Sequence, residues 1–295
     1  MSAARKTLLV SFHGGEAATA INTLRGFPDG APRFDLLVGA PPMKELRKFL
    51  FDSSIGHLYV ANADKNSSKI LLFTPTPASQ QWQFQRVFVS EGLAHPFDVV
   101  FGPEGDLFVS NQDTEPNIVT RYDTTGKQVK QVPFRFKAVR GLAYDGTYLY
   151  VADSGAKPGY VAALDAKWTM YPIPVEQPVH LLWDALHRWL FIGSESENSV
   201  LAWNPADRAS SPIAVIPKEL SPINHTGGIA LDPAPSGPSA TLYVASRIGQ
   251  QILSFPLDFS SGKPQWNPRT WEPVLNKEQL TEEPEFVGIA GGAYG

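Results

Sequence analysis

The chain has 295 residues, of which 43% are hydrophobic and 11% aromatic, and its formal net charge is -4. This apolar content is sufficient for a packed core and excludes an intrinsically disordered chain. Lys and Arg form no basic run or stripe in the sequence. We therefore expect neither a nucleic acid nor a membrane as a partner.

The chain contains no cysteine, which favours a reducing compartment and predicts a cytoplasmic protein. Two basic residues precede the apolar run Thr7–Phe12, as they would in a signal peptide. The run is short for that role and lacks a small-residue cleavage site, so a strand explains it better. No apolar segment approaches the roughly 18 residues that a transmembrane helix needs. The sequence predicts a soluble monomer.

One strand pattern recurs along the chain at intervals of about forty to fifty residues, a spacing typical of propellers and solenoids. The copies are TLLVSF at Thr7–Phe12, HLYVAN at His57–Asn62, DLFVSN at 106–111, YLYVAD at 148–153, WLFIGS at Trp189–Ser194 and TLYVAS at 241–246. The fullest repeat, residues 95–125, consists of strand, turn, strand, loop, strand and turn. The aromatic residues at these strand positions are interpreted as packing between blades.

The last segment, 286–290, matches the first strand of a repeat but has no second strand after it. The chain can supply that second strand only from Thr7–Phe12, which would close a ring and remove two sheet edges. We predict one domain, residues 1–295, folded as an all-β, six-bladed β-propeller with four-stranded antiparallel blades. The expected blades are residues 286–295 with 6–38, then 46–89, 97–134, 140–173, 180–216 and 228–275. The N-terminal part of the first blade is expected to have strands at 7–12, 21–24 and 33–38.

In a propeller, first strands begin and second strands end at the same face, around one mouth of the axial channel. The sequence places many polar residues at these two kinds of position or directly after them. We expect the following side chains to meet at the mouth: Phe12, His13, Glu45, Lys48, Asn62, His95, Asp98, Asn111, Asp113, Arg140, Asp153, His180, Ser194, Glu195, His225, Ser246, Arg247 and Glu285.

Imidazoles and carboxylates from different blades are suited to general acid and base catalysis. Asp, Asn and Glu oxygens favour calcium or magnesium, whereas several neutral imidazoles would favour zinc. The alternative for Asn or Asp at a strand end is capping of the next turn, and for a histidine it is a solvated loop position. The predicted catalytic residues are His95, His180, His225 and Asp153; the metal ligands are Asn62, Asn111, Asp153 and Glu285; the substrate-binding residues are His13, Asp98, Asp113, Arg140, Glu195 and Arg247.

The repeated LYVAD and LYVAN strands, with HPFDVVFGPEGDLFVSN as the fullest copy, resemble the NHL-repeat and gluconolactonase-like (senescence-marker-protein-like) superfamily of six-bladed propellers. This resemblance implies lactonases or esterases with a calcium-type cation at the mouth, metal-dependent lyases, or propellers that only bind partners. The Leu-Gly-Glu-Gly-Pro, Asn-Asp-Gly and Asn-Gly strings of gluconolactonases are absent, and only Asn111 and Asp153 occupy the expected strand ends. His95 and His225 align with Glu285 in our repeat alignment, and His180 lies three places further along.

We therefore predict a small-molecule-binding propeller, specifically a metal-assisted lactone or ester hydrolase. A divalent cation, calcium or magnesium rather than zinc, would polarise the carbonyl and lower the pKa of a bound water. No nucleotide cofactor is expected, because the chain has no glycine-rich phosphate loop. The alternatives are a lyase or cyclase acting on a natural product or peptide, and a non-catalytic scaffold that binds peptide or protein.

Overall fold

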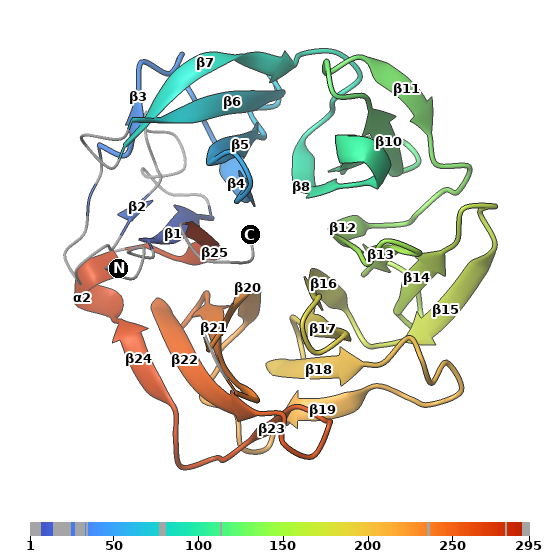
Figure 1. The fold of residues 1–295 in the computed structure, drawn as a ribbon, viewed down its shortest axis with the longest axis vertical. Coiled ribbons are helices and arrows are strands. Elements are labelled where there is room, and N and C mark those ends of the chain that lie inside the picture. The colour runs from blue at the N-terminus through green and yellow to red at the C-terminus, as the bar shows by residue number, and fades with distance from the viewer. Residues whose placement is uncertain are drawn as a thin grey trace.

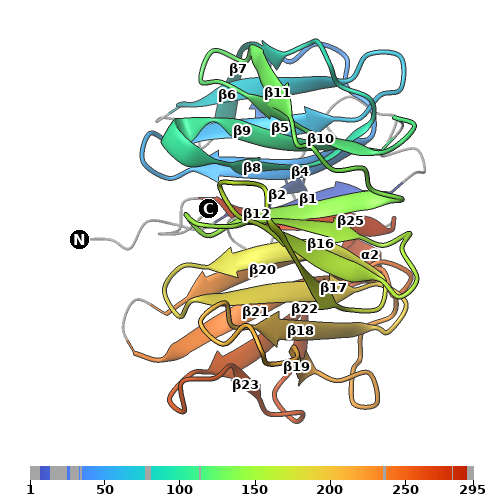
Figure 2. The ribbon, with the colours of Figure 1, turned by 90° about the vertical axis from the view of Figure 1, so that its right-hand side faces the viewer.

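The computed structural model describes residues 7–13, 25–26, 33, 35–76, 81–112, 114–234, 237–280 and 282–290. Its sheets stand around a central axis like the blades of a wheel, as Figure 1 shows. Seen from the side, the strands of neighbouring sheets are stacked in layers (Figure 2). The predicted all-β propeller architecture is confirmed.

Five blades have at least four described strands each. One contains β4 (Leu46–Asp52), β5 (His57–Asn62), β6 (Lys69–Thr76), β7 (Gln81–Val89) and the short β3 (Leu37–Val38). The next contains β8 (Pro96–Phe101), β9 (Leu107–Asn111), β10 (Ile118–Tyr122) and β11 (Gln128–Gln131), with the 3-10 turn η1 (Pro103–Gly105) between its first two strands.

The remaining complete blades follow in chain order. They are β12 (Val139–Tyr144), β13 (Leu149–Asp153), β14 (Tyr160–Leu164) and β15 (Met170–Pro174); β16 (Pro178–Asp184), β17 (Trp189–Ser194), β18 (Ser199–Trp203) and β19 (Ile213–Ile216); and β20 (Thr226–Pro233), β21 (Ser239–Ser246), β22 (Gln251–Asp258), β23 (Gln265–Trp266) and β24 (Glu272–Leu275). The short helix α2 (Lys277–Leu280) leads to the last strand, β25 (Pro284–Ala290).

The two ends of the chain close the ring, as predicted. β1 (Thr7–Phe12) pairs antiparallel with β25, from Thr7 opposite Ala290 to Phe12 opposite Pro284. β2 (Arg25–Gly26) adds to the other edge of β1, so this terminal sheet has only three described strands. The prediction of a six-bladed propeller with four-stranded blades is wrong: five blades have at least four strands, and the sheet formed by the two termini has three in the part of the chain that the structure describes.

One strand that joins a different sheet from the one predicted explains part of this difference. Residues 33–38 were expected to form the last strand of the terminal blade, but Leu37–Val38 instead pairs parallel with the outer strand β7 of the next blade. The Trp82 backbone N–H donates to Leu36 O at 2.7 Å, and Leu36 and Leu37 are both buried. Leu37–Val38 therefore extends the neighbouring sheet at the outer edge of β7. This pairing is parallel, whereas antiparallel blades were predicted. The predicted strand at 21–24 lies outside the described residues.

Apolar side chains of neighbouring sheets form the core between blades. Tyr59 of β5 packs edge-on against Phe88 and against Phe101 of the next blade, with ring centroids 5.1 and 5.6 Å apart. Tyr150 stacks on Trp183 of the next blade and packs edge-on against Trp203. Pairs of this kind stabilise an interior beyond the area they bury. The interpretation of the strand aromatics as packing residues agrees with these contacts.

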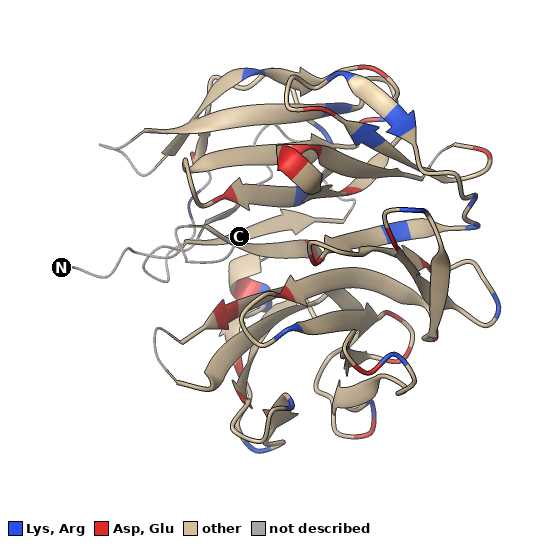
Figure 3. Ribbon diagram, turned by 45° about the vertical axis from the view of Figure 1, so that its right-hand side comes forward, with Lys and Arg blue, Asp and Glu red and all other residues tan. Residues whose placement is uncertain are grey.

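Charged residues of both signs are interspersed over the loops and strand ends, as Figure 3 shows. No helix in the part of the chain that the structure describes is long and apolar enough to span a membrane.

Candidate functional site

Every sheet has the same irregularity near the start of its first strand. The first strand has one more residue than its partner at this point, for example between Leu46 and Phe49 of β4 and between Pro96 and Val99 of β8. Such a β-bulge turns consecutive side chains toward the same side. The bulges therefore add positions from which each blade can point a side chain at the channel.

The common register of these bulges defines three rows of equivalent positions around the channel. The rim row is Glu45, His95, Ala138, Gln177, His225 and Glu283; the upper row is Arg47, Phe97, Arg140, Val179, Gly227 and Glu285; the lower row is Lys48, Asp98, Gly141, His180, Gly228 and Phe286. His95 and His225 thus align with Glu283, and our sequence alignment with Glu285 was wrong by two residues. His180 does lie three places further along.

The predicted metal ligands Asn62, Asn111 and Asp153 perform one structural task in three blades. Asn62 Oδ1 accepts from the Lys44 backbone N–H at 2.7 Å, and Asn111 Oδ1 accepts from the Ala94 N–H at 2.9 Å. The two Asp153 oxygens accept from the N–H groups of Lys137 and Ala138. Three of these donors, Lys44, Ala94 and Lys137, directly precede the rim-row residue of their blade. These buried side chains hold the loop that enters each first strand, which is the capping alternative.

His180 lies below the mouth in an aromatic cluster. Its ring centroid is 5.4 Å from that of Phe97 and 4.7 Å from that of Phe286, and the residue is 3% exposed. Burial lowers its pKa to about 3, although the Glu285 carboxylate acts in the opposite direction. The imidazole is therefore neutral at ordinary pH and covered, so the structure gives no support to the predicted catalytic role.

Asp98 also lies in the lower row and is buried. Its Oδ2 accepts from the Leu142 backbone N–H at 2.9 Å, across to the next blade, and Lys48 Nζ is 3.5 Å from Oδ1. Burial raises the pKa of Asp98, while Lys48 and the backbone donors act against this rise. These contacts join neighbouring first strands, so Asp98 is placed to stabilise the ring rather than to bind substrate.

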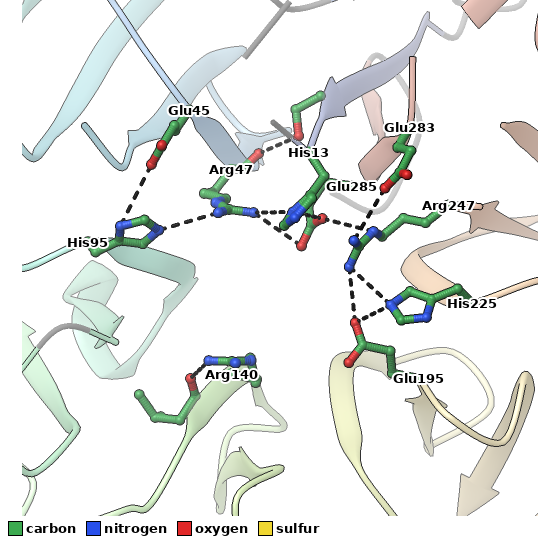
Figure 4. Close-up of polar contacts among 12 residues, drawn as sticks. His13, Glu45, Arg47, His95, Arg140, Glu195, His225, Arg247, Glu283 and Glu285 are labelled. Carbon is green, nitrogen blue, oxygen red and sulfur yellow. Dashed lines mark hydrogen bonds and ion pairs between the residues drawn. The ribbon is translucent and has the colours of Figure 1, made fainter. Parts of the chain in front are cut away.

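The buried carboxylate of Glu285 is the centre of the polar network in Figure 4. His13 Nδ1 lies 2.7 Å from Oε2, Arg47 NH1 lies 3.2 Å from Oε1, and Arg247 Nε lies 3.6 Å from Oε2. Burial acts to raise the pKa of Glu285, but the His13 hydrogen bond and the charges of Arg47 and Arg247 outweigh it and lower the pKa to about 2. Glu285 is thus ionised throughout the physiological range.

Arg247 connects this centre to a second imidazole–carboxylate pair. Its NH1 lies 3.2 Å from Glu195 Oε1 and its NH2 lies 3.3 Å from Glu283 Oε2. His225 Nε2 is 2.7 Å from the same Glu195 oxygen and 3.1 Å from Arg247 NH1. One guanidinium therefore holds three acidic groups from two segments of the chain, Glu195 after β17 and Glu283 and Glu285 at the start of β25.

The network continues on the other side through Arg47. Its NH2 lies 3.3 Å from His95 Nε2, and His95 Nδ1 lies 3.7 Å from Glu45 Oε2. Arg140 projects into the same region from β12, where its guanidinium lies over the ring of Phe97 at 5.6 Å. Burial lowers the pKa of Arg140, and the Glu195 and Glu285 charges oppose this effect.

The structure therefore brings together six of the predicted site residues, His13, His95, Glu195, His225, Arg247 and Glu285, with Arg140 facing them. Asp113 lies outside the described residues. Sequence reasoning missed Arg47 and Glu283. The signal that could have found Arg47 is its alignment with Arg140 in the upper row, which becomes visible only once the bulges are known.

These residues do not fit a divalent cation. The oxygens of Glu285 face two guanidinium groups and an imidazole N–H, which are cationic or donating groups that repel a metal ion. The described residues contain no group of three or more His, Asp or Glu side chains with the geometry of a metal site. Asn62, Asn111 and Asp153 of the predicted ligand set are hydrogen-bonded to backbone N–H groups instead.

Comparison with known proteins identifies the architecture. No family model matches the sequence, and no curated protein matches it either. A propeller in a nidogen/laminin complex is similar over 97% of this chain and 98% of that one, at a TM-score of 0.67 and 14% identity. The periplasmic gluconolactonase of Pseudomonas aeruginosa is similar over 88% and 81%, at 0.62 and 18%. The likeness establishes the fold.

A third neighbour, a putative 6-phosphogluconolactonase from Bacteroides uniformis, is similar over 91% of this chain and 82% of that one, with a TM-score of 0.62 and 12% identity. Lactonase-like and nidogen propellers are thus both among the structural neighbours. The likeness to these structures shows the propeller fold, which the resemblance of the repeated strands implied.

Proposed function

We propose that this protein hydrolyses a lactone or ester of a small molecule at the channel mouth, with His13 as the general base. The observation that carries the proposal is the contact of 2.7 Å between His13 Nδ1 and the buried, ionised Glu285. The His13 side chain is 40% exposed at the mouth, whereas that of Glu285 is 4% exposed. Nε2 of His13 forms no hydrogen bond or ion pair within the described residues.

This geometry gives the two residues distinct roles. Nδ1 of His13 lies 2.7 Å from ionised Glu285 and 3.3 Å from Arg47 NH1. In this proposal the shorter contact decides the tautomer: Nδ1 carries the hydrogen and Nε2 the lone pair, as the aspartate arranges in a serine hydrolase triad. Nε2 can then accept a proton from a water molecule as the oxygen of that water attacks the substrate carbonyl. The protonated imidazole returns this proton to the departing alkoxide oxygen. The products are a carboxylic acid and an alcohol, which are one hydroxy acid when the substrate is a lactone.

Arg47 and Arg247 support this step without contacting the substrate. Both guanidinium groups lie beside Glu285, and their charges help keep its pKa at about 2. A protonated Glu285 would no longer favour the reactive tautomer of His13. The metal-assisted route expected from the sequence is not part of this proposal, because the donor set does not fit a cation.

The test is a panel of lactones, including D-glucono-1,5-lactone, and p-nitrophenyl esters, assayed by pH-stat and by absorbance with the buffer rate subtracted. We expect His13→Asn to lower kcat by about 10²–10⁴-fold, the usual contribution of a positioned base. His57→Asn is the matched control, because His57 begins β5 at the opposite end of that strand from the mouth. Hydrolysis unchanged in His13→Asn, or no turnover of the whole panel by the wild type, would overturn the proposal.

A second candidate is a non-catalytic scaffold, which the neighbour from the nidogen/laminin complex favours because it matches nearly the whole of both chains. This candidate expects no turnover by the wild type and binding of a peptide at the mouth. A peptide library screened against the wild type and Glu195→Lys separates the two functions. A scaffold requires peptide binding that the charge reversal abolishes, together with the absence of hydrolysis.

A further inference from the structure

The three arginines at the mouth differ in their partners. Arg47 and Arg247 both contact Glu285, and Arg247 also contacts Glu195 and Glu283. Arg140 forms no ion pair within the described part of the chain; its NH1 donates to the Val139 carbonyl at 3.3 Å. A guanidinium has five N–H donors, so most of the donors of Arg140 remain available.

The surroundings of Arg140 hold it in place without neutralising it. The guanidinium lies over the aromatic ring of Phe97 at 5.6 Å, a favourable cation–π arrangement that leaves the edge of the guanidinium group open. Burial lowers the pKa of Arg140, so its charge is partly removed from water. Removing a charge from water without a partner costs free energy. An incoming anion would recover this cost.

Arg140 lies at the same mouth as the proposed base, His13. It belongs to the upper row together with Arg47 and Glu285, and Figure 4 shows it across the opening from them. The carboxylates of Glu195 and Glu285 act on Arg140 over a distance, but each already contacts an arginine and an imidazole. Their repulsion of an incoming anion is therefore partly cancelled.

We infer that the substrate carries an anionic oxygen group, a carboxylate or a phosphate, and that Arg140 binds this group through two parallel N–H···O hydrogen bonds. This inference rests on the proposed function, because it names the substrate class of the same mouth. Guanidinium matches both groups in geometry and charge. The anionic end then lies at Arg140, and the carbonyl lies across the opening near His13.

Binding of three sugars with the same ring tests the inference by calorimetry: D-glucose 6-phosphate, D-glucuronate and D-glucose. We expect at least one of the two anions to bind about tenfold or more tightly than glucose, and the tighter anion identifies the group. Arg140→Met should remove this preference, and Arg140→Lys should restore only part of it because lysine lacks the planar fork. Arg208→Met is the matched control, since Arg208 packs on Tyr148 and Tyr171 away from the mouth.

Two results would overturn the inference: equal binding of all three sugars by the wild type, or an anion preference that persists in Arg140→Met. His13→Asn keeps this test separate from that of the proposed function. Loss of turnover with retained anion preference in His13→Asn supports both claims. Anion preference that depends on Arg140, without hydrolysis by the wild type, supports the binding site and rejects the hydrolase.

Discussion

Two sets of equivalent positions surround the same mouth, and they behave in opposite ways. At the ends of the second strands, Asn62, Asn111, Asp153, Ser194 and Ser246 each bond the backbone just before the rim row. The same structural role, a hydrogen bond to the loop that enters the first strand, is repeated in these five blades. In the upper row of the first strands, every blade supplies a different kind of side chain or a different set of contacts.

The upper row contains Arg47, Phe97, Arg140, Val179, Gly227 and Glu285. These positions share a backbone geometry but no chemical role. Structure that all blades need is encoded by similar residues at the repeated position, whereas a binding site on the axis needs unlike residues there. In this protein the repeated polar residues therefore support the fold, and the unrepeated ones are the candidates for function.

The largest effect should come from substituting Glu285, the centre of the polar network formed by the unrepeated residues. We expect Glu285→Ala to lower the free energy of unfolding by about 3–5 kcal/mol, the usual result of deleting one member of a buried ion pair. Arg47 and Arg247 would lose their common partner. Hydrolysis by the folded fraction should fall with it, because His13 loses the group that orients it. Urea denaturation followed by tryptophan fluorescence gives the stability.

Glu285→Gln provides the control for shape, because it retains one oxygen acceptor but removes the charge. Glu285→Gln should lower the free energy of unfolding much less than Glu285→Ala does. It should lower turnover by about as much as Glu285→Ala. If Glu285→Ala is as stable as the wild type, the network is not a unit and the contrast between the two sets fails.

A smaller effect is expected from the repeated set. Asp153→Ala should lower the free energy of unfolding by about 1–3 kcal/mol, because the N–H groups of Lys137, Ala138 and Gly155 lose their acceptor. Turnover per folded molecule should stay close to that of the wild type. Asp153→Asn, which retains one acceptor, should recover part of the stability. Loss of turnover in Asp153→Asn at unchanged stability would instead restore the catalytic role predicted from the sequence.

The periodicity of the sequence predicted most of the architecture. The recurring LYVA strands and the unpaired final segment were sufficient to place β1 beside β25. The inequality of the blades could not be predicted, because Leu37–Val38 pairs with the edge of β7, a long-range pairing that no local pattern encodes. Propensity fixes where a strand forms, and tertiary packing decides which edge it joins.

The site was predicted in part for a related reason. Position at a strand end correctly gathered His13, His225 and Glu285 at one mouth. The same rule also selected Asn111, because an Asn that holds a loop and an Asn that binds a ligand are identical in sequence. Arg47 was missed because a bulge of one residue changes which side chain faces the channel, and bulges leave no clear trace in the apolar pattern.

The smallest effect at neutral pH is expected at His180, which belongs to the unrepeated lower row yet is packed as an apolar residue. His180→Phe conserves an aromatic ring between Phe97 and Phe286, so the free energy of unfolding at pH 7 should change by less than about 1.5 kcal/mol. Turnover should be unaffected. A large loss of turnover at unchanged stability would contradict the structural role.

Acid titration separates His180 from Glu285. Burial lowers the His180 pKa from 6.5 to about 3, so between these values the unfolded chain binds a proton that the folded chain does not. The wild type should therefore lose stability as pH falls from 6.5 toward 3, by at most about 1.4 kcal/mol per pH unit from this group. His180→Phe should lack this component. Both proteins should still lose the Glu285 contribution as pH falls from 4.5 toward 2, since the Glu285 pKa is lowered to about 2. Chemical denaturation at closely spaced pH values measures the difference, and parallel curves for the two proteins between pH 6.5 and 4.5 would show that His180 is not buried as a neutral ring.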